Sequence, residues 1–379
     1  MLPAWLEPRT AYLHVPFCAH HCGYCDFAVA ANQDHLIELY LDAIAIEMAT
    51  LKTPRPVETI FLGGGTPTHL SATQLQRLFG SVSTWFRDAS EFSIESTPES
   101  IAPDKVAVLK AGGVTRVSIG IQSFHAGTLS ALDRQHSVAQ IHTAAALIRD
   151  ARLHLSLDLI FGAPGQSLAD WQNDLSTVLT LQPDHLSTYG LTYEKGTPLW
   201  KRRQRGEVTA ATEDLELSMY ETAIDTLTTA GFEHYETSNF AKPERRCQHN
   251  ERYWANHAYY GFGVGAARYV NGVRSMNIRN TVDYIRKVLA DEDPTQQSEE
   301  LMPRERAFET MAVQLRRCEG IERESFRGQT DFAIDDLIGE SVKVLVTEGL
   351  LIDDGDSILL TRRGMNVADG IIEMLMKQR

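Results

Sequence analysis

The chain contains 379 residues, of which 43% are hydrophobic and 23% are charged, and its formal net charge is −14. The length predicts a large domain accompanied by a smaller one, and the composition excludes a largely disordered chain. Nucleic acid is excluded as a partner, because a chain this acidic repels polyphosphate and its sequence shows no strong basic patch.

The cellular location is predicted from what the sequence lacks. No apolar run approaches the roughly 20 residues that a membrane-spanning helix needs, and the opening residues MLPAWLEPRTAY do not have the pattern of a signal peptide. The five cysteines do not form the evenly paired set of a secreted disulfide protein. We therefore expect a cytoplasmic protein without a transmembrane segment, and peripheral contact with a membrane stays open.

Strand-like and helix-like segments alternate along the first half of the chain. Apolar runs rich in β-forming residues predict strands at 11–15, 59–63, 91–96, 116–122, 155–162 and 185–191. Apolar residues at helical spacing predict helices at 35–51, 72–86, 103–113 and 138–151. This rhythm is typical of an α/β protein with a parallel sheet, and six repeats predict a partial (β/α)6 barrel of the TIM type. A flat doubly wound sheet is the alternative.

The second half of the chain is less regular. Residues 234–272 predict loops and short strands. Within them, the sequence GFGVGA predicts a tight turn that closes the barrel mouth, with contact to a cofactor or second ligand as the alternative. A dinucleotide-binding loop is not expected, because no clear strand precedes it and no βαβ unit follows. The polar segment 291–300 predicts a linker between a large domain, 1–290, and a small helical domain, 301–379. A helix, a two-strand wing and a second helix predict a winged-helix-like fold for the small domain. Its 16 acidic and 11 basic residues from position 300 onward argue against binding to DNA.

Three of the five cysteines are crowded into FCAHHCGYCDF, residues 17–27, directly after the first predicted strand. Thiols at this spacing, Cys18, Cys22 and Cys25, can surround a small inorganic centre. A zinc site needs a fourth ligand, which His20 or His21 could supply. A [4Fe–4S] cube held by three thiolates leaves one iron open to an outside molecule. Three structural thiols are the remaining alternative.

The segment HVPFCAHHCGYCDF resembles the CxxxCxxC signature of the radical S-adenosylmethionine enzymes. The resemblance implies a [4Fe–4S] cluster on Cys18, Cys22 and Cys25. It also implies that the open iron chelates the amino and carboxylate groups of S-adenosylmethionine. In such a protein the cofactor carries the difficult chemistry, and the chain supplies geometry and a protected cavity.

Further motifs resemble the cofactor contacts of the coproporphyrinogen dehydrogenase branch of that family. Most of them lie at or near the carboxyl ends of predicted strands, where barrel sites form. Carboxylates suit ribose hydroxyls, and a guanidinium suits the cofactor's carboxylate. The resemblance implies S-adenosylmethionine contacts at Tyr12, Tyr24, Gly64, Gly65, Thr66, Glu95, Gln122, Arg134 and Asp158.

Three features resemble the haem chaperones of the HemW type more than the dehydrogenase. Phe27 stands where the dehydrogenase has a further cysteine, and only eleven residues precede Tyr12. The sequence QHNERYW matches the HNxxYW motif of the haem chaperones at His249, Asn250, Tyr253 and Trp254.

The resemblance implies a protein that binds haem, through the imidazole of His249, and hands it to haem-accepting respiratory proteins. A hydrogen-bonded structural histidine is the alternative for His249. A homodimer is possible. An oxygen-independent coproporphyrinogen III dehydrogenase and a radical methyltransferase acting on haem are the alternative functions, so enzymatic activity stays undecided.

Overall fold

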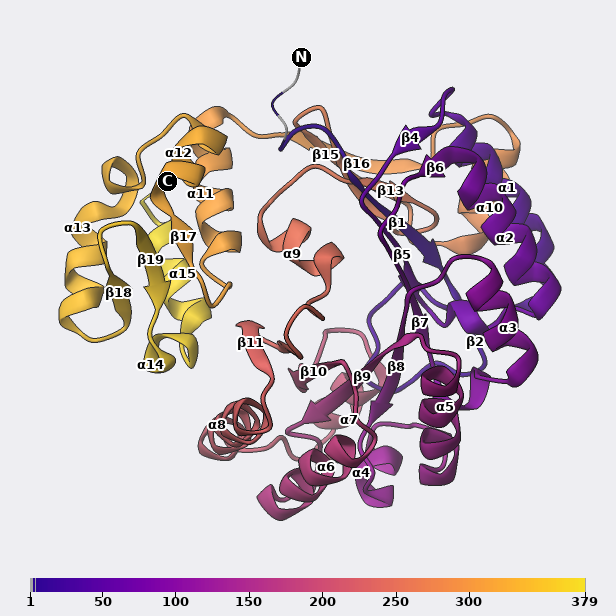
Figure 1. The fold of residues 1–379 in the computed structure, drawn as a ribbon, viewed down its shortest axis with the longest axis horizontal. Coiled ribbons are helices and arrows are strands. Elements are labelled where there is room, and N and C mark those ends of the chain that lie inside the picture. The colour runs from indigo at the N-terminus through magenta and orange to yellow at the C-terminus, as the bar shows by residue number, and fades with distance from the viewer. Residues whose placement is uncertain (1–2, 4, 379) are drawn as a thin grey trace.

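A computed structural model describes residues 3 and 5–378 of the chain (Figure 1). Its centre is a sheet in which six strands run parallel, in the order in which they follow one another along the chain. The strand order of a doubly wound sheet would reverse partway, so this sequential order identifies a partial, open barrel. The six strands are β1 (Thr10–Val15), β5 (Thr59–Gly64), β7 (Glu91–Ser96), β8 (Arg116–Gln122), β9 (His154–Phe161) and β10 (His185–Gly190).

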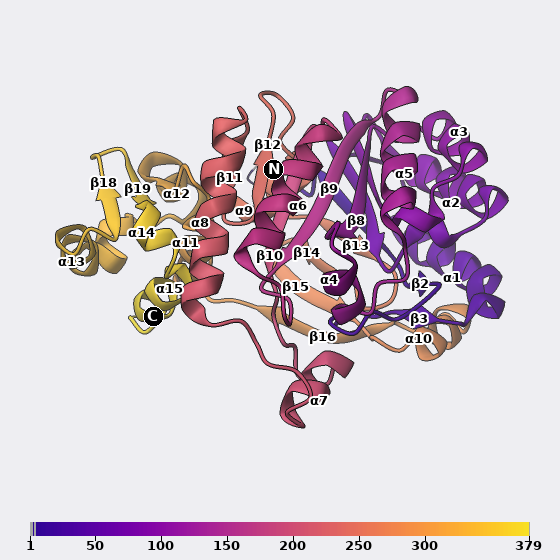
Figure 2. The ribbon, with the colours of Figure 1, turned by 90° about the horizontal axis from the view of Figure 1, so that it is seen from below.

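Helices cover the outer face of this sheet (Figures 1 and 2). Several begin with a serine whose hydroxyl accepts a hydrogen bond from the backbone N–H three residues on, an arrangement that fixes where a helix starts. Leu75, Ile141 and Trp171 are examples of their fully buried apolar residues. The helices are α1 (Ile37–Ala49), α2 (Ala72–Trp85), α3 (Pro103–Ala111), α4 (Ala126–Ala131), α5 (Val138–Asp150), α6 (Leu168–Thr180) and α8 (Glu213–Thr229).

The two edges of the sheet are not joined to each other. On one side β10 pairs with β12 (Asn239–Ala241), which pairs with β11 (Glu233–Glu236), both antiparallel. On the other side β1 pairs in parallel with β13 (Tyr260–Phe262). The predicted partial (β/α)6 barrel is confirmed, and its open side faces the rest of the chain.

Three local predictions for the second half require correction. A strand, β13, does precede the turn of GFGVGA, and it was overlooked because it has only three residues. The predicted linker is partly a strand: β16 (Thr295–Glu300) pairs with β15 (Val273–Asn277), and it is polar because most of its side chains are exposed. The motif QHNERYW forms a helix, α9 (Gln248–Trp254), where loops and short strands were expected.

The remaining elements include β14 (Ala267–Val270), which pairs with β15, and α10 (Thr281–Leu289), which packs on α1. Short strands complete the cysteine segment and the outer rim: β2 (Phe17–Cys18) pairs with β3 (Ala30–Ala31), and β4 (Arg55–Pro56) pairs with β6 (Phe86–Arg87). Among the described residues, no helix is both long enough and apolar enough to cross a bilayer.

The small C-terminal unit has an apolar core of its own. Its helices are α11 (Pro303–Gln314), α12 (Arg323–Thr330), α13 (Ile334–Thr347), α14 (Arg362–Met365) and α15 (Ala368–Met376). The predicted wing forms as β18 (Leu351–Asp353) and β19 (Ser357–Leu360), and β17 (Ile321–Glu322) joins them. The exact domain limits, 1–290 and 301–379, stay a prediction.

The helix α9 lies between the sheet and the small unit (Figure 1). The amide of Gln314 on α11 and that of Gln329 on α12 each donate a hydrogen bond to the carbonyl oxygen of Ala255, the residue that ends α9. Arg362 on α14 pairs with Asp225 on α8. The small unit is therefore held to the open side of the barrel at α9 and at α8.

Candidate cofactor site

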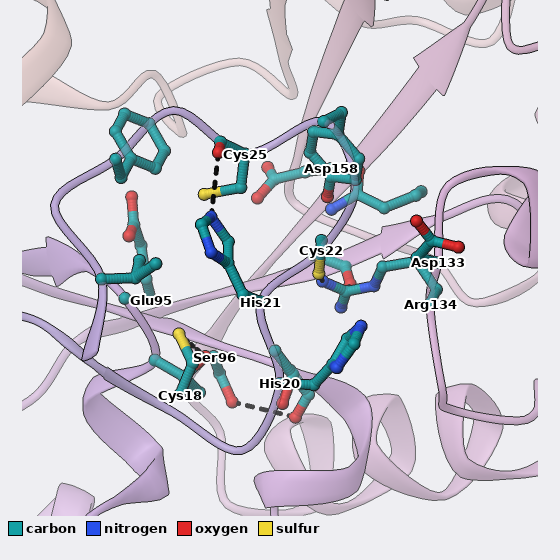
Figure 3. Close-up of a pocket in the computed structure, with 18 of the residues that line it drawn as sticks. Cys18, His20, His21, Cys22, Cys25, Glu95, Ser96, Asp133, Arg134 and Asp158 are labelled. Carbon is teal, nitrogen blue, oxygen red and sulfur yellow. Dashed lines mark hydrogen bonds between the residues drawn. The ribbon is translucent and has the colours of Figure 1, made fainter. Parts of the chain in front are cut away.

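The loop that carries the cysteines follows β1 and lies over the carboxyl ends of the strands. It borders a cavity of about 740 Å³. Cys18, Cys22 and Cys25 are half-buried free thiols, and all three line this cavity (Figure 3). The structure therefore brings the predicted cluster ligands together in one place.

The donor set suits a cluster better than a single ion. The described residues include no group of three or more His, Cys, Asp or Glu side chains that could hold one metal ion, whereas zinc needs its ligands around one centre. His21, a candidate fourth zinc ligand, has its Nε2 3.1 Å from the carbonyl oxygen of Cys25. A cube can take each thiolate at a separate iron corner.

Burial holds the thiols of Cys18 and Cys25 in their neutral form when no metal is bound. Loss of water raises the pKa of Cys18 to about 12 and the pKa of Cys25 to about 11. The hydroxyl of Thr66 lies 3.4 Å from the sulfur of Cys18 and partly opposes this rise. The positive charge of bound iron would stabilise the thiolates, so metal binding should release protons.

Arg134 connects the cysteine loop to the sheet. Its Nη1 donates to the sulfur of Cys22 at 3.3 Å, and its Nη2 donates to the carbonyl oxygen of Gly120 near the end of β8 at 2.7 Å. The Nε of Arg134 is buried and has no hydrogen-bond partner within the described part of the chain. The guanidinium thus places a fixed positive charge at the cavity wall, where a carboxylate could bind.

Two carboxylates face the cavity from neighbouring parts of the sheet, Glu95 on β7 and Asp158 on β9. Burial raises the pKa of Glu95 to about 7, and the negative charge of Asp158 adds to the rise. Burial likewise raises the pKa of Asp158 to about 6, although hydrogen bonds from Ser187 and Ser118 oppose it. Such a pair is suited to hydroxyl groups or to a cationic ligand, either of which would offset the cost of burying negative charge.

The glycines at the end of β5 and directly after it have no room for side chains. Gly64 has a φ of +106°, and a Cβ there would lie 2.3 Å from the imidazole Cε1 of His14. A Cβ on Gly65 would lie 2.6 Å from the carbonyl carbon of Pro16. The N–H of Gly64 donates to Glu95 at 2.8 Å, so the glycine backbone and the carboxylate form one structural unit.

Most of the predicted cofactor contacts line the cavity. They are Tyr24, Gly64, Gly65, Thr66, Glu95, Gln122, Arg134 and Asp158. Tyr12 is not among the lining residues: its hydroxyl lies 3.0 Å from Nδ1 of His14, and its ring stacks on Phe61. Direct contact of Tyr12 with a cofactor stays a prediction.

Sequence reasoning missed His14, which links Tyr12 to the cysteine loop. Its Nε2 lies 2.8 Å from the carbonyl oxygen of Ala28, and burial lowers its pKa to about 4, so the ring is neutral. With Nδ1 accepting from Tyr12, Nε2 donates to that carbonyl. The alternation of side chains along β1 places His14 on the same face as Tyr12, and this signal was available in the sequence.

His249 lies away from this cavity, on α9. It is 1% exposed, and its ring packs against Phe61 and Tyr253. Its Nδ1 is 2.9 Å from the hydroxyl oxygen of Thr59, whose own proton goes to Thr10. Nδ1 is therefore the protonated nitrogen, and Nε2 carries a lone pair that has no partner among the described residues. Burial lowers the pKa of His249 to about 3.

The open, partial (β/α)6 barrel with a three-cysteine loop at its mouth defines a radical S-adenosylmethionine protein. The family model of the radical SAM superfamily matches residues 12–178, and that of the HemN C-terminal domain matches residues 301–367. The solved coproporphyrinogen III oxidase HemN of Escherichia coli superposes with a TM-score of 0.86 over 98% of this chain and 90% of that one. At 24% identity this likeness shows the fold alone.

Curated relatives define the family more narrowly. The haem chaperone HemW of Bacillus subtilis is 34% identical over 94% of this chain and 96% of its own length. The haem chaperone HemW of Escherichia coli is 30% identical over 98% of this chain and 99% of its own. The chain belongs to the HemW family of the radical SAM superfamily.

Proposed function

We propose that this chain is a haem chaperone of the HemW type, which binds haem and transfers it to respiratory haem proteins. The observation that carries the proposal is the similarity to HemW proteins along almost the whole of both chains. It extends across the barrel, α9 and the small unit. Cytoplasmic location, peripheral membrane contact and a homodimer belong to the same proposal.

The cavity would hold the two cofactors that the superfamily implies. Cys18, Cys22 and Cys25 would bind a [4Fe–4S] cluster, and S-adenosylmethionine would occupy the space between the cluster and the strand ends. When bound, this pair supplies one-electron chemistry.

The side chains of the cavity have distinct roles in this proposal. Arg134 would pair with the carboxylate of S-adenosylmethionine. Because Gly64 and Gly65 have no side chains, the amino group of S-adenosylmethionine could approach their backbone closely. Glu95 and Asp158 would accept hydrogen bonds from the ribose hydroxyls. Tyr24 and Gln122 complete the wall, and they shield the site from water.

His249 is the haem ligand in the proposal. The neutral ring and the unpartnered Nε2 lone pair support it, because an imidazole binds haem iron through such a nitrogen. Phe61 and Tyr253 occupy the space around the ring, so haem can reach Nε2 only when α9 moves away from the sheet. Haem loading is therefore coupled to a displacement of α9.

Anaerobic titration of the purified protein with haem tests the proposal. The wild type should develop a shifted Soret band with saturable binding, and His249→Gln should weaken binding and alter the band. His257→Gln is the matched control, because it makes the same change at a half-buried imidazole just beyond the same helix. If both variants bind like the wild type, His249 is not the ligand; if the wild type does not bind haem, the chaperone function is wrong.

The coproporphyrinogen dehydrogenase alternative is supported by the common fold with HemN. It predicts that protein with a reduced cluster and S-adenosylmethionine releases carbon dioxide from coproporphyrinogen III. We expect no such turnover. Turnover without haem binding would favour the dehydrogenase over the chaperone.

A further inference from the structure

One segment concentrates positive charge although the whole chain has a net charge of −14. Residues 195–205 contain no acidic residue and five basic ones, Lys195, Lys201, Arg202, Arg203 and Arg205. Most of the segment is the short helix α7 (Pro198–Gln204), which projects from the barrel (Figure 2). The expectation of no strong basic patch did not take this run into account, although four of its five charges lie within residues 201–205 of the sequence and α7 displays them on one projection.

These charges are available to a partner. Lys195, Lys201, Arg203 and Arg205 are exposed. Arg202 is 3.7 Å from Asp133, and Arg205 pairs with Glu207. Within the described part of the chain, no carboxylate forms an ion pair with Lys195, Lys201 or Arg203. Lys195 and Lys201 thus face solvent without an ion pair among the described residues, and Arg203 keeps its positive charge while its guanidinium lies over the ring of Tyr193, 4.6 Å from the ring centroid.

The same helix is attached to the cysteine loop. The backbone N–H of Leu199 on α7 donates to the carbonyl oxygen of Gly23, which lies between Cys22 and Tyr24, at 2.8 Å. Leu199 is fully buried in a small apolar cluster against which Tyr24 packs. The Asp133 that faces Arg202 also lies directly against Gly23. The basic projection therefore lies beside the proposed cluster.

We propose that residues 195–205 form the docking surface for a small acidic electron-carrier protein that reduces the cluster. The inference rests on the cluster in the proposed function. One electron leaves the reduced flavin or iron–sulfur centre of the carrier and enters the cluster, so the carrier is oxidised by one electron and no covalent bond changes. Electron-transfer partners form small, weak interfaces, for which a projecting helix offers enough surface.

Charge supplies both the attraction and the selectivity of this surface. A protein that is acidic overall repels an acidic carrier everywhere except at a local basic patch. Docking at residues 195–205 then directs the carrier to the side of the barrel on which the cysteine loop lies. Because residues 195–205 lie beside the proposed cluster, a protein that docks on them is well placed to pass an electron to it.

An anionic lipid surface would also attract these charges, but stable insertion into a membrane needs several exposed apolar side chains. Among residues 195–205, all of them described, Leu199 is buried and Trp200 is half-buried, and no other large hydrophobic side chain is present. The structure therefore favours a protein partner.

The test measures binding directly, with a bacterial flavodoxin, a small acidic protein that carries FMN, as the probe. Anaerobic calorimetry on the holoprotein should give binding that weakens as salt is added. The double variant Lys201→Glu and Arg203→Glu should weaken binding by about tenfold or more. The control is the double variant Lys343→Glu and Lys377→Glu, which changes the net charge by the same amount. Its substitutions lie on α13 and beside α15, so binding of flavodoxin should change little. Lys195→Glu, in the exposed loop, provides a second variant that leaves α7 intact.

A second readout separates docking from the cluster itself. Reduction of the cluster by photoreduced flavodoxin should slow in the α7 variants, whereas reduction by dithionite should reach the same electron paramagnetic resonance signal.

Equal loss of flavodoxin binding in the control variants would overturn the proposal, and so would unchanged binding in the α7 variants. Binding of the wild type to phosphatidylglycerol vesicles, lost in the α7 variants while flavodoxin binding is not, would assign the surface to lipid instead. Failure of dithionite to produce a signal would contradict the cluster, not the docking surface.

Discussion

Arg134 and Cys22 are joined by a hydrogen bond of 3.3 Å from the guanidinium Nη1 to the sulfur. The residues are 112 positions apart in the chain, and the second arm of the same guanidinium binds Gly120 on β8. This contact fixes the cysteine loop relative to the strand ends. It also leaves a positive charge beside the position where a ligand carboxylate is expected.

Replacement of Arg134 should therefore impair both cofactors. Arg134→Leu should lower the affinity for S-adenosylmethionine by about 10-fold to 100-fold and reduce iron retention, as is typical when a residue that supports metal ligands is lost. Arg134→Lys keeps the charge but not the two-armed geometry, and its affinity should be intermediate. Calorimetry and iron analysis provide the measurements. Arg149→Leu on α5, which removes an arginine bonded to Gln182, is the control; wild-type affinity in Arg134→Leu would contradict the role.

The partial barrel was predictable because its strands and helices are marked by sequence patterns within each element. Alternating side chains and buried apolar runs placed all six parallel strands within one residue at each end, and helical spacing located α1, α2, α3 and α5. Serine caps that define three helix starts are also visible in sequence. Most of the cofactor cavity followed, because parallel strands bring their carboxyl ends to one edge.

The elements that escaped prediction depend on distant contacts. The helix α9 has seven residues, and its first backbone N–H groups are bound by Glu91, more than 150 positions earlier. The strand β16 is polar and is defined by its pairing with β15. The burial of His249 under Phe61 and Tyr253 could not be foreseen for the same reason. Elements this short contain too few residues for a helical or strand pattern to be recognised in the sequence.

The raised pKa of Glu95, to about 7, predicts how stability depends on pH in cofactor-free protein. The unfolded side chain titrates near 4.5, so between pH 4.5 and pH 7 the folded state binds more protons than the unfolded state. The stability that this group contributes is complete below pH 4.5 and is lost as the pH rises through 7.

Glu95→Gln should remove this dependence, because a neutral amide has no proton to lose. The variant should therefore melt at a higher temperature than the wild type at pH 8, and the difference should shrink toward pH 5. Thermal unfolding followed by circular dichroism at both pH values checks this. Glu194→Gln, at an exposed position on the same cavity, should show no such trend. A difference that grows toward acid pH would contradict the sign.

Gly64 and Gly113 provide a matched pair for the glycine segment. Both have positive φ, +106° and +84°, so alanine at either position is strained by about 1–2 kcal/mol. Only at Gly64 would the new Cβ collide with a neighbour, the ring of His14, whereas Gly113 has nothing within 4 Å. Chemical denaturation should show a clearly larger loss of unfolding free energy for Gly64→Ala, together with lost S-adenosylmethionine binding. Equal losses would mean that the contact with His14 is unimportant.

Glu91 controls α9 and thus, in the proposed function, access of haem to His249. Its carboxylate accepts hydrogen bonds of 3.1 Å from the backbone N–H groups of Gln248 and His249, and it lies 3.4 Å from Arg116. Glu91→Gln removes the negative charge from this buried site. It also places an amide N–H₂ group, which cannot accept a hydrogen bond, against one of the donors. The free energy of unfolding should fall by about 1–3 kcal/mol.

Haem association should become faster in Glu91→Gln, because a less firmly held α9 leaves the sheet more often. Stopped-flow absorbance at the Soret band measures this rate. Glu38→Gln, which breaks exposed contacts with Arg77 and Gln74 on the barrel's outer face, should change stability by less than about 1 kcal/mol and leave the rate unaltered. Slower association in Glu91→Gln would show that haem reaches its site with α9 in place. In that case the unpartnered Nε2 of His249 is a structural feature, and the iron ligand must be sought on another face of the molecule.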